Sequence, residues 1–312
     1  MPAILTLDAS LQRVRSGLES RARRISGRVG EELAAHMARP GKMLRSRFCL
    51  LLGAALGVKA EPAEAAARGM EFVHNASLLH DDCVDQARLR RGRPTPNDVF
   101  GVNVALLLGD LAFAQGLEEV MDLSASAARR LVSAAREMAV GELHEEFLKG
   151  SVNVTVEAYL GVISRKTGVL FEWCGATLSE LSPLPHADAD PPRLGNAAGM
   201  LLQIIDDIHD YTLNDRVSGK EQGKDLAEGR MTLPAILALN DPKTRPEFLR
   251  LWQAGEAGPL ARLLEASGHL DAARARGREL VRSMRNWAGA LPVAEYRGEF
   301  LGFIEAMERR EF

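Results

Sequence analysis

The sequence predicts an all-α protein. Three observations support this fold class: Ala, Leu, Glu and Arg dominate the composition, apolar residues recur at spacings of three and four, and alternating β-branched runs are scarce. A chain of 312 residues is long enough for two domains, but no long linker interrupts it. We therefore expect a single domain, residues 1–312, built as a bundle of roughly ten or more helices.

The expected helices are separated by connections that combine Pro, Gly, Asn and Asp. These connections are "RPGK" (39–42), "RGRPTPND" (91–98), "SPLPHADADPP" (182–192), "NDRVSGKEQGKDLAEG" (214–229) and "NDPKTRPE" (240–247). Between them, apolar residues stay on one helical face. In chain order we expect helices at Leu7–Ala38 with a break near Ser26-Gly27, Lys42–Leu56, Ala63–Asp85, Val102–Leu123, Ser126–Lys149, Val156–Leu181, Arg193–Asp210, Met231–Leu239, Gly258–Glu265, Leu270–Ala290 and Ala294–Arg309.

The net charge, the cysteines and the longest apolar run indicate which partners and which location to expect. The formal net charge of −3 and the pI near 6.2 argue against general electrostatic capture of nucleic acid or of an acidic membrane. Cys49, Cys83 and Cys174 are odd in number and far apart in apolar runs, which predicts reduced core residues and a cytoplasmic location. The longest apolar run, "VNVALLLGDLAFAQGL", is interrupted by Asp110, so we expect no transmembrane segment.

The stretch "SLLHDDCVDQARLRRG" places Asp81, Asp82 and Asp85 near the end of a predicted helix. Asp81 and Asp85 stand at i and i+4, so their side chains project together and their like charges repel. They also occupy the C-terminal end of the helix, where the macrodipole disfavours anions. A bound cation would reverse both effects.

The same arrangement returns in "LLQIIDDIHDYT", where Asp206 and Asp210 stand at i and i+4 with Asp207 beside them. Carboxylates without His or Cys ligand spacing suit Mg²⁺, which usually takes one or two of them and completes its shell with water and phosphate oxygens. Either cluster alone could be a solvated acidic helix end. Together the two clusters predict a magnesium-bound diphosphate.

Side chains that suit phosphate accompany both clusters. Arg90 and Arg91 follow the first cluster with planar, multi-donor guanidinium groups. His74 and Gln203 each stand seven residues before an aspartate of a cluster, on the same helical face. Each alone could be a solvent-exposed cation or a satisfied core group, but together they indicate phosphate binding. The other candidates are Lys42 and Arg45 after Pro40-Gly41, Lys166-Thr167, and Lys220 and Lys224 in "SGKEQGKD".

These motifs resemble those of the trans-polyprenyl diphosphate synthase family, the head-to-tail isoprenyl chain elongators. "HDDCVDQARLRRGRPTPN" resembles the first aspartate-rich motif with its trailing arginines, and "QIIDDIHDYT" followed by "GKDLAEGRMTLP" resembles the second motif and its loop. "GKMLR", "RKTGVLFEWC" and "LPVAEYRGEFLGF" extend the resemblance nearly from end to end. The pattern is closer to octaprenyl- and solanesyl-type members than to the farnesyl type.

The resemblance implies an isoprenoid synthase type I fold around a deep apolar cavity, usually in a homodimer. It implies a trans-prenyltransferase that condenses isopentenyl diphosphate with an allylic prenyl diphosphate by Mg-assisted ionisation and releases diphosphate. Mg²⁺ would be the cofactor, with about three ions per active site once diphosphate is bound. No nucleic acid partner is implied.

The resemblance also assigns roles to individual residues. Asp81, Asp85, Asp206 and Asp210 would bind Mg²⁺, and Asp82 and Asp207 would assist them in catalysis together with Lys166. Arg90, Lys166, Thr167, Gln203 and Lys224 match positions that contact the allylic diphosphate, while Lys42, Arg45, His74 and Arg91 match those that hold isopentenyl diphosphate. Lys220 is a further candidate for substrate binding.

Some positions depart from the family pattern. Where members commonly carry Gly-Gly-Lys-Arg-x-Arg-Pro, this chain has Pro40, Met43 and Ser46, and Met43 removes a cation near the isopentenyl site. His209 replaces a common leucine in the second motif, and we interpret it either as a packing residue or as one that supports the metal ligands without binding the metal. We interpret Cys83 in the first motif as a packing residue.

Product length depends on the residues that precede the first motif. Short-chain members place bulky aromatics one turn back, where this chain has Ala76 and Ser77, so the cavity should continue past them. Each further turn, about 5.4 Å, would admit roughly one more isoprene unit before Val73 and then Met70. Phe113, Leu117 or Met121 on the neighbouring helix are further candidates for the end of the cavity. The expected product is medium to long, although small residues also permit close helix packing.

Other activities share part of this pattern. A short-chain farnesyl or geranylgeranyl diphosphate synthase is the main alternative. A terpene cyclase would carry a different second motif, and a non-catalytic subunit of a two-component prenyl synthase would lack aspartates. A His-Asp metal-dependent phosphohydrolase would require additional histidine ligands and would leave the second cluster unexplained.

Overall fold

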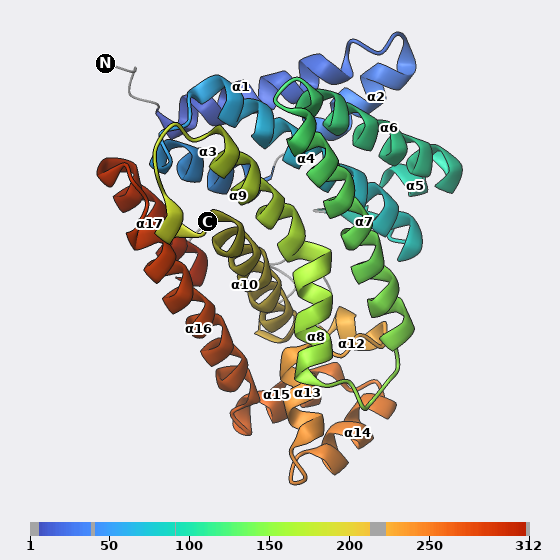
Figure 1. Ribbon diagram of the computed structural model, residues 1–312. Helices are drawn as coiled ribbons and strands as arrows, with labels where there is room; N and C mark the ends of the chain where they lie inside the picture. The colour runs from blue at the N-terminus through green and yellow to red at the C-terminus, as the bar shows by residue number, and fades with distance from the viewer. Residues whose placement is uncertain (1–5, 39–40, 91, 213–222, 310–312) are drawn as a thin grey trace. The chain divides into compact units, whose positions relative to one another are not determined.

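The computed structural model describes residues 6–38, 41–90, 92–212 and 223–309, and these residues are helical nearly throughout (Figure 1). The prediction of an all-α protein is confirmed. The first half of the chain contains α1 (Leu7–Ala22), α2 (Arg28–Met37), α3 (Leu44–Ala55), α4 (Ala60–Val84), α5 (Pro96–Phe100), α6 (Val102–Met121) and α7 (Ala125–Leu148). The second half contains α8 (Val156–Ile163), α9 (Val169–Leu181), α10 (Pro191–Thr212), α12 (Lys224–Ala227), α13 (Leu233–Asn240), α14 (Arg245–Gln253), α15 (Ala257–Ala266), α16 (His269–Gly289) and α17 (Ala294–Arg309).

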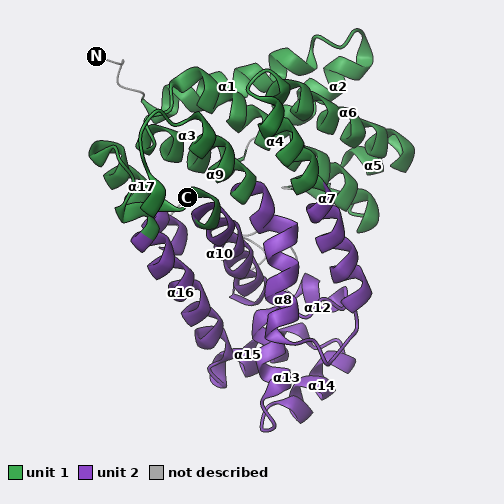
Figure 2. Cartoon of the chain, viewed as in Figure 1, with its two compact units in different colours: residues 1–135, 172–193, 287–303 green, residues 136–171, 194–286, 304–312 purple. Residues whose placement is uncertain are grey.

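The chain divides into two compact units (Figure 2). Unit 1 comprises residues 1–135, 172–193 and 287–303, and unit 2 comprises residues 136–171, 194–286 and 304–312. Neither unit is a continuous stretch of sequence. Five helices, α7, α9, α10, α16 and α17, contribute residues to both units.

The expected helix boundaries are confirmed in part. The break near Ser26-Gly27 is present, because Gly27 has a φ of 71° between α1 and α2. The expected helix Val156–Leu181 consists instead of α8, a π-helical turn at Ser164–Gly168 and α9.

Several short elements lie where the sequence predicted no helix or strand. Pro96 and Pro246 stand in the first turns of α5 and α14. The N–H groups of a first turn have no partner within the helix, so a proline there costs no hydrogen bond and can start a helix. Residues Leu89–Arg90 (β1) and Arg93–Pro94 (β2) pair as antiparallel strands. The helix α12 and the 3₁₀ turn Ala187–Ala189 also lie within expected connections.

In unit 1, α4 lies against α3 and α6 (Figure 1). Two glycines permit the close approach of α4 and α6. A Cβ atom on Gly69 would lie only 2.4 Å from Cγ2 of Val120, and one on Gly116 would lie 3.1 Å from Cγ2 of Val73. Phe48 of α3 meets Phe300 of α17 edge to face, with ring centroids 5.5 Å apart. The glycine contacts thus bring α4 close to α6, and the phenylalanine pair joins α3 to α17.

The three cysteines are free thiols. Cys49 and Cys174 are buried, as the sequence predicted, and burial raises the pKa of the Cys174 thiol well above its usual range. Cys83 is only partly buried, so its assignment to the core was wrong. Its place near the C-terminal end of α4, just before the chain turns into β1, explains its exposure.

In unit 2, α13 lies at the centre of the apolar core. Leu233, Ile236 and Leu239 are almost completely buried, and Phe248 of α14 packs against the same cluster. A helix that is buried on all sides has a continuous apolar sequence instead of a periodic one. None of the helices in the described ranges has the length and apolar character needed to cross a bilayer.

From the close contact between α4 and α6 we predict the effect of a substitution on stability. Gly69→Ala should lower the free energy of unfolding by about 1–3 kcal/mol, because Val120 is fully buried and its β-branched side chain cannot rotate away. Gly298→Ala on α17 is the control, because a Cβ atom there meets nothing within 4 Å. It should leave stability unchanged or raise it by up to about 1 kcal/mol. Urea denaturation of both variants measures the difference, and equal stabilities would contradict the packing described.

Candidate active site

The first aspartate cluster lies at the C-terminal end of α4 in unit 1. Asp81 and Asp82 belong to the last turn, and Asp85 is the residue that follows the helix, its backbone N–H donating to the Asp81 carbonyl at 2.8 Å. Asp81 and Asp85 are partly exposed, whereas the Asp82 side chain is only 1% exposed. The cluster therefore separates an accessible outer pair from a buried middle carboxylate.

Arg90 contacts the buried member of this cluster. Its Nε donates to Oδ1 of Asp82 at 2.7 Å, and the arginine side chain is 28% exposed. Arg90 lies on β1, and this segment is held by Thr95, whose hydroxyl donates to the Ala87 carbonyl at 2.6 Å. The arginine thus compensates a charge that would otherwise be costly to bury. Arg91 lies outside the described residues.

The candidates for isopentenyl diphosphate binding lie on α3, on α4 and just before α3. Lys42 is exposed, while Arg45 and His74 are partly buried. Met43, directly before α3, has a φ of 48°, in the left-handed region that non-glycine residues seldom adopt. Ser46 follows closely and is fully buried.

Ser46, one of the departures from the family pattern, anchors this segment. Its N–H and its hydroxyl both donate to Oε1 of Glu71, at 3.2 and 2.7 Å. Glu71 is itself 7% exposed on α4. A proline at position 46 has no N–H group and no hydroxyl, so it would lack both bonds. The serine thus fixes the start of α3, and with it Arg45, to the helix that carries the first aspartate cluster.

The residues expected to control product length also lie in unit 1. Met70, Val73 and Ala76 are buried along α4, and Ser77 is partly exposed, with its hydroxyl donating to the His74 carbonyl at 2.9 Å. On α6, Phe113 and Leu117 are partly buried. Met121 is 65% exposed, so the structure contradicts the expectation that it lines an apolar interior. It is the last residue of α6, at an end of the helix that is exposed to solvent.

The second aspartate cluster lies in the last turns of α10 in unit 2. Asp206 is exposed and Asp210 is partly exposed. The Asp210 carboxylate accepts the backbone N–H groups of Lys224 and Asp225, each at 3.2 Å, and its carbonyl accepts that of Gly223 at 3.0 Å. Asp210 therefore fixes the start of α12 beside the end of α10.

The middle aspartate of this cluster, Asp207, is again the buried one, at 3% exposed. Its Oδ2 accepts the hydroxyl of Tyr159 at 2.6 Å and its Oδ1 accepts the amide of Gln203 at 2.8 Å. Gln203 in turn accepts the hydroxyl of Thr167 at 3.0 Å. Burial, together with the nearby charge of Asp225, raises the pKa of Asp207 well above its usual range. His209 is partly buried.

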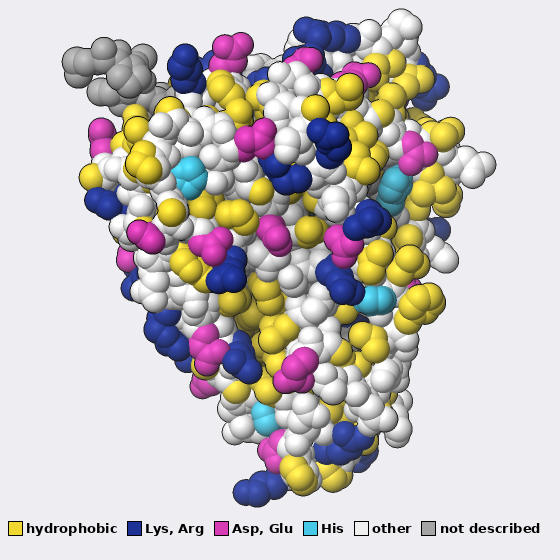
Figure 3. Space-filling model, in the orientation of Figure 1, with side chains coloured by type: hydrophobic (Ala, Val, Ile, Leu, Met, Phe, Trp, Pro, Cys, Tyr) yellow, Lys and Arg dark blue, Asp and Glu magenta, His cyan; other side chains and the backbone are white. Residues whose placement is uncertain are grey.

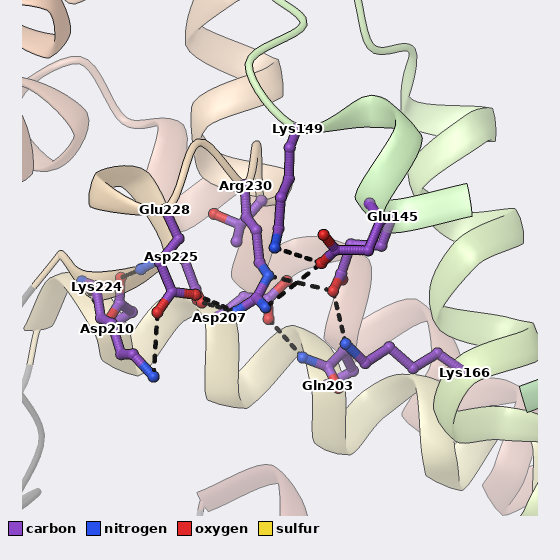
Figure 4. Close-up of polar contacts among 12 residues, drawn as sticks. Glu145, Lys149, Lys166, Gln203, Asp207, Asp210, Lys224, Asp225, Glu228 and Arg230 are labelled. Atoms are coloured by element: carbon purple, nitrogen blue, oxygen red, sulfur yellow. Dashed lines mark hydrogen bonds and ion pairs between the residues drawn. The ribbon is translucent and has the colours of Figure 1, made fainter. Parts of the chain in front are cut away.

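Lys166 and Thr167 lie in the π-helical turn Ser164–Gly168, a feature that is frequent at functional sites. The Lys166 ammonium group contacts Glu145 of α7 at 2.6 Å (Figure 4). It also contacts Glu142 of the same helix at 2.7 Å. Arg230, only 13% exposed, contacts the same Glu145 carboxylate at 3.3 Å and also pairs with Glu228. Glu145 is thus shared between two cations.

The end of the loop that follows the second motif completes this network. Lys224 pairs with Glu228 at 3.2 Å and is 41% exposed. Lys220 lies outside the described residues. A small pocket of about 130 Å³ opens in unit 2, lined on its polar side by Glu145, Lys149, Tyr159, Lys166, Gln203, Asp207, Asp225 and Arg230 and on its apolar side by Leu148, Val154, Val162, Ile163 and Met231.

Among the residues of this network that were not singled out from the sequence are Glu145, Tyr159, Asp225 and Arg230. Signals for three of them were present. Asp225 and Arg230 stand within "GKDLAEGRMTLP", and Tyr159 precedes Lys166 by seven residues, the same spacing that pointed to His74 and Gln203. Glu145 lies among several glutamates of α7 and has no distinguishing signal.

Comparisons with known proteins agree with this arrangement of helices and motifs. The sequence model of the family "Polyprenyl synthetase" matches residues 28–261. The all-trans-nonaprenyl-diphosphate synthase (geranyl-diphosphate specific) of Rhodobacter capsulatus is 33% identical over 264 residues, covering 82% of this chain and 81% of the relative. The geranylgeranyl diphosphate synthase of Mycobacterium tuberculosis is 34% identical, covering 70% of this chain and 64% of the relative.

A solved structure extends the similarity to the whole fold. Polyprenyl synthase from Caulobacter crescentus, crystallised with calcium and isoprenyl diphosphate, superposes with a TM-score of 0.89 at 26% identity, covering 98% of this chain and 96% of that one. The helical fold and the paired aspartate motifs define a prenyltransferase of the all-α isoprenoid synthase type. The chain belongs to the polyprenyl synthetase family, whose members use divalent metal ions and isoprenyl diphosphate substrates.

From the Asp82–Arg90 pair we predict changes in the free energy of unfolding, which can be measured without an activity assay. Arg90→Met should lower the free energy of unfolding by about 1–3 kcal/mol, because it removes the cation beside a carboxylate that is 1% exposed. Asp82→Asn should be destabilising as well. In the double variant the two losses should not add, with a coupling energy of about 1–3 kcal/mol in urea denaturation. Strict additivity would show that the pair contributes nothing.

Proposed function

We propose that this enzyme condenses isopentenyl diphosphate with an allylic prenyl diphosphate to give a medium-to-long all-trans polyprenyl diphosphate, and releases diphosphate. The observation that supports this most is the repeated design of the two aspartate clusters. In each, an accessible i, i+4 carboxylate pair ends a helix, and the buried middle aspartate is held by hydrogen-bond donors.

We propose Mg²⁺ as the metal. The accessible ligands at Asp81, Asp85, Asp206 and Asp210 are all hard carboxylate oxygens, which suit Mg²⁺. Within the described ranges, no group of three or more His, Cys, Asp and Glu side chains converges to hold an ion by itself. This agrees with an ion that takes few protein ligands and shares the oxygens of a bound diphosphate. Three ions per active site remain our proposal.

The cations of unit 2 suit the allylic diphosphate. Lys166 and Lys224 offer ammonium groups, and Thr167 and Gln203 offer polar groups linked to Asp207. Lys166 is held between Glu142 and Glu145, so binding a diphosphate would exchange carboxylate contacts for phosphate contacts. In unit 1, Arg90 would join the allylic group, and Lys42, Arg45 and His74 would hold isopentenyl diphosphate. Arg91 and Lys220 complete the proposed set.

These residues suit ionisation of the allylic substrate. The metal would supply charge stabilisation for the departing diphosphate, and Lys166 and Arg90 would add fixed positive charge beside it. No protein nucleophile is required, because the double bond of isopentenyl diphosphate attacks the allylic cation. The resulting carbocation then loses a proton to the released diphosphate. The apolar side chains must exclude water, which would otherwise capture the cation as an alcohol.

The proposal of a medium-to-long product is based on α4. Ala76 and Ser77 are small at the position where short-chain members carry aromatics, and Val73 and Met70 follow at successive turns. The nonaprenyl synthase relative agrees with this reading. The geranylgeranyl synthase relative makes a shorter product the second candidate.

Product analysis tests the function. The purified chain, with Mg²⁺, labelled isopentenyl diphosphate and farnesyl diphosphate, should give products longer than geranylgeranyl diphosphate on chromatography after dephosphorylation. Asp81→Ala should lower product formation by at least about 100-fold, because a metal ligand is lost. Products that stop at geranylgeranyl would favour the second candidate. Absence of isopentenyl incorporation by the unaltered chain would refute the proposed activity.

We also propose that the enzyme is a homodimer and that α6 contributes to the interface. Along this helix Val104, Leu107 and Met121 are 42, 67 and 65% exposed. Hydrophobic side chains gather over α5 and α6 at the right of the space-filling view (Figure 3). Exposed apolar side chains gathered on one helix are typical of a protein interface, and a second copy of the chain is the partner that we propose.

Leu107→Arg is the variant that tests the dimer. Sedimentation velocity should find a dimer for the unaltered chain and a monomer for this variant, because two arginines would be buried at an isologous interface. Leu89→Arg on β1 is the matched control, since Leu89 is 65% exposed outside α6. The control should remain dimeric. A monomeric parent chain, or a Leu107→Arg dimer, would remove α6 from the interface.

We propose further that the two units act as one synthase domain, residues 1–312, in the cytoplasm. The family match at 28–261 includes residues of both units. The free thiols of Cys49, Cys83 and Cys174 fit a reducing compartment.

A further inference from the structure

We propose that Tyr159 is a positioning residue that orients the second aspartate motif through its hydrogen bond to Asp207. This inference rests on the proposed function. Tyr159 lies on α8 and donates its hydroxyl to Oδ2 of Asp207 on α10 at 2.6 Å. The two residues are 6 and 3% exposed, so water does not replace this bond.

The environment keeps Tyr159 a hydrogen-bond donor. Burial, reinforced by the charge of Asp207, raises the pKa of the Tyr159 hydroxyl well above its usual range, so it remains protonated. Its ring packs in the apolar core of unit 2, which fixes the direction of the hydroxyl. The helix that carries it starts at Thr155, whose side chain accepts the N–H of Ala158 at 3.1 Å.

The bond to Tyr159 is the first link of a chain that reaches the substrate-binding residues. Asp207 accepts the Gln203 amide at 2.8 Å, and Gln203 accepts the Thr167 hydroxyl at 3.0 Å. Because an amide has distinct donor and acceptor ends, the carboxylate sets the orientation of Gln203 and thus of its bond to Thr167. Loss of the Tyr159 hydroxyl would therefore affect both the second aspartate motif and the π-helical turn.

The two motifs hold their middle aspartates by different means. In the first, Arg90 brings a positive charge to Asp82. In the second, the hydrogen-bond donors to Asp207 within the described chain, Tyr159 and Gln203, are both neutral. They orient the carboxyl group without bringing a positive charge to it. A neutral hydroxyl therefore positions Asp207 without adding a cation beside the aspartates proposed to bind metal, which gives a reason for a tyrosine here.

Tyr211 offers a matched control for the removal of a buried hydroxyl. It is 3% exposed in the same apolar core, and its hydroxyl forms a 2.6 Å hydrogen bond with that of Thr232. Both Tyr159→Phe and Tyr211→Phe should lower the melting temperature, and Tyr159→Phe by at least as much, because its lost bond leaves a buried carboxyl group with one donor fewer. The two variants should differ in the Mg²⁺ concentration that they require and in kcat/KM for the allylic diphosphate.

Two readouts separate positioning from folding. With Mg²⁺ and inorganic diphosphate as probes, the unaltered chain and Tyr211→Phe should gain thermal stability at similar Mg²⁺ concentrations. Tyr159→Phe should require about 10-fold more Mg²⁺. In the condensation assay, kcat/KM for the allylic diphosphate should fall by about 10- to 100-fold in Tyr159→Phe and by less than about threefold in Tyr211→Phe.

A double variant tests whether Asp207 transmits the effect. If Tyr159 acts through Asp207, Tyr159→Phe should lower kcat/KM little further in an Asp207→Asn background. Equal effects of Tyr159→Phe and Tyr211→Phe in both readouts, or full additivity with Asp207→Asn, would overturn the inference. An unaltered chain that forms no prenyl product would instead refute the proposed function. In that case the Mg²⁺ and diphosphate titration still decides whether Tyr159 organises the motif.

Discussion

Repulsion between carboxylates gathered at a helix end is the constraint on which the candidate site depends. At the ends of α4 and α10 the chain places three aspartates within five residues, where neither neighbouring charges nor the helix dipole favour them. The structure resolves this conflict by dividing each motif. One aspartate is buried and held by donors, while the outer pair remains accessible. A motif built in this way is tolerated by the fold and leaves its outer carboxylates accessible to cations.

The fold class and the motifs were predictable because they depend on local spacing. Helical periodicity and Pro/Gly breakers determine most of the helices, and the i, i+4 rule places Asp81 with Asp85 and Asp206 with Asp210 on common faces. Burial within each motif was not predictable. Asp81 and Asp82 are neighbours with the same chemistry, and only the packing around α4 decides which of them is covered.

The missed elements have identifiable physical causes. Pro246 stands in the first turn of α14, although the stretch that contains it, "NDPKTRPE", indicated a connection. Arg230 and Glu145 are far apart in sequence and meet only through folding of unit 2. Tyr159 resembled any core aromatic until the structure placed its hydroxyl against Asp207. Contacts between distant segments carry no local signal, so single-sequence reasoning does not find them.

The π-helical turn at Ser164–Gly168 has a consequence for how such sequences are compared. An α-helix advances about 100° per residue, so one additional residue in a turn rotates everything that follows by nearly a third of a revolution. Face assignments made along α8 therefore do not carry over to α9. Two relatives that differ by a single-residue gap at this turn would present different sides of α9 to its neighbours. Such a gap would alter the shape of the interior while leaving every motif intact.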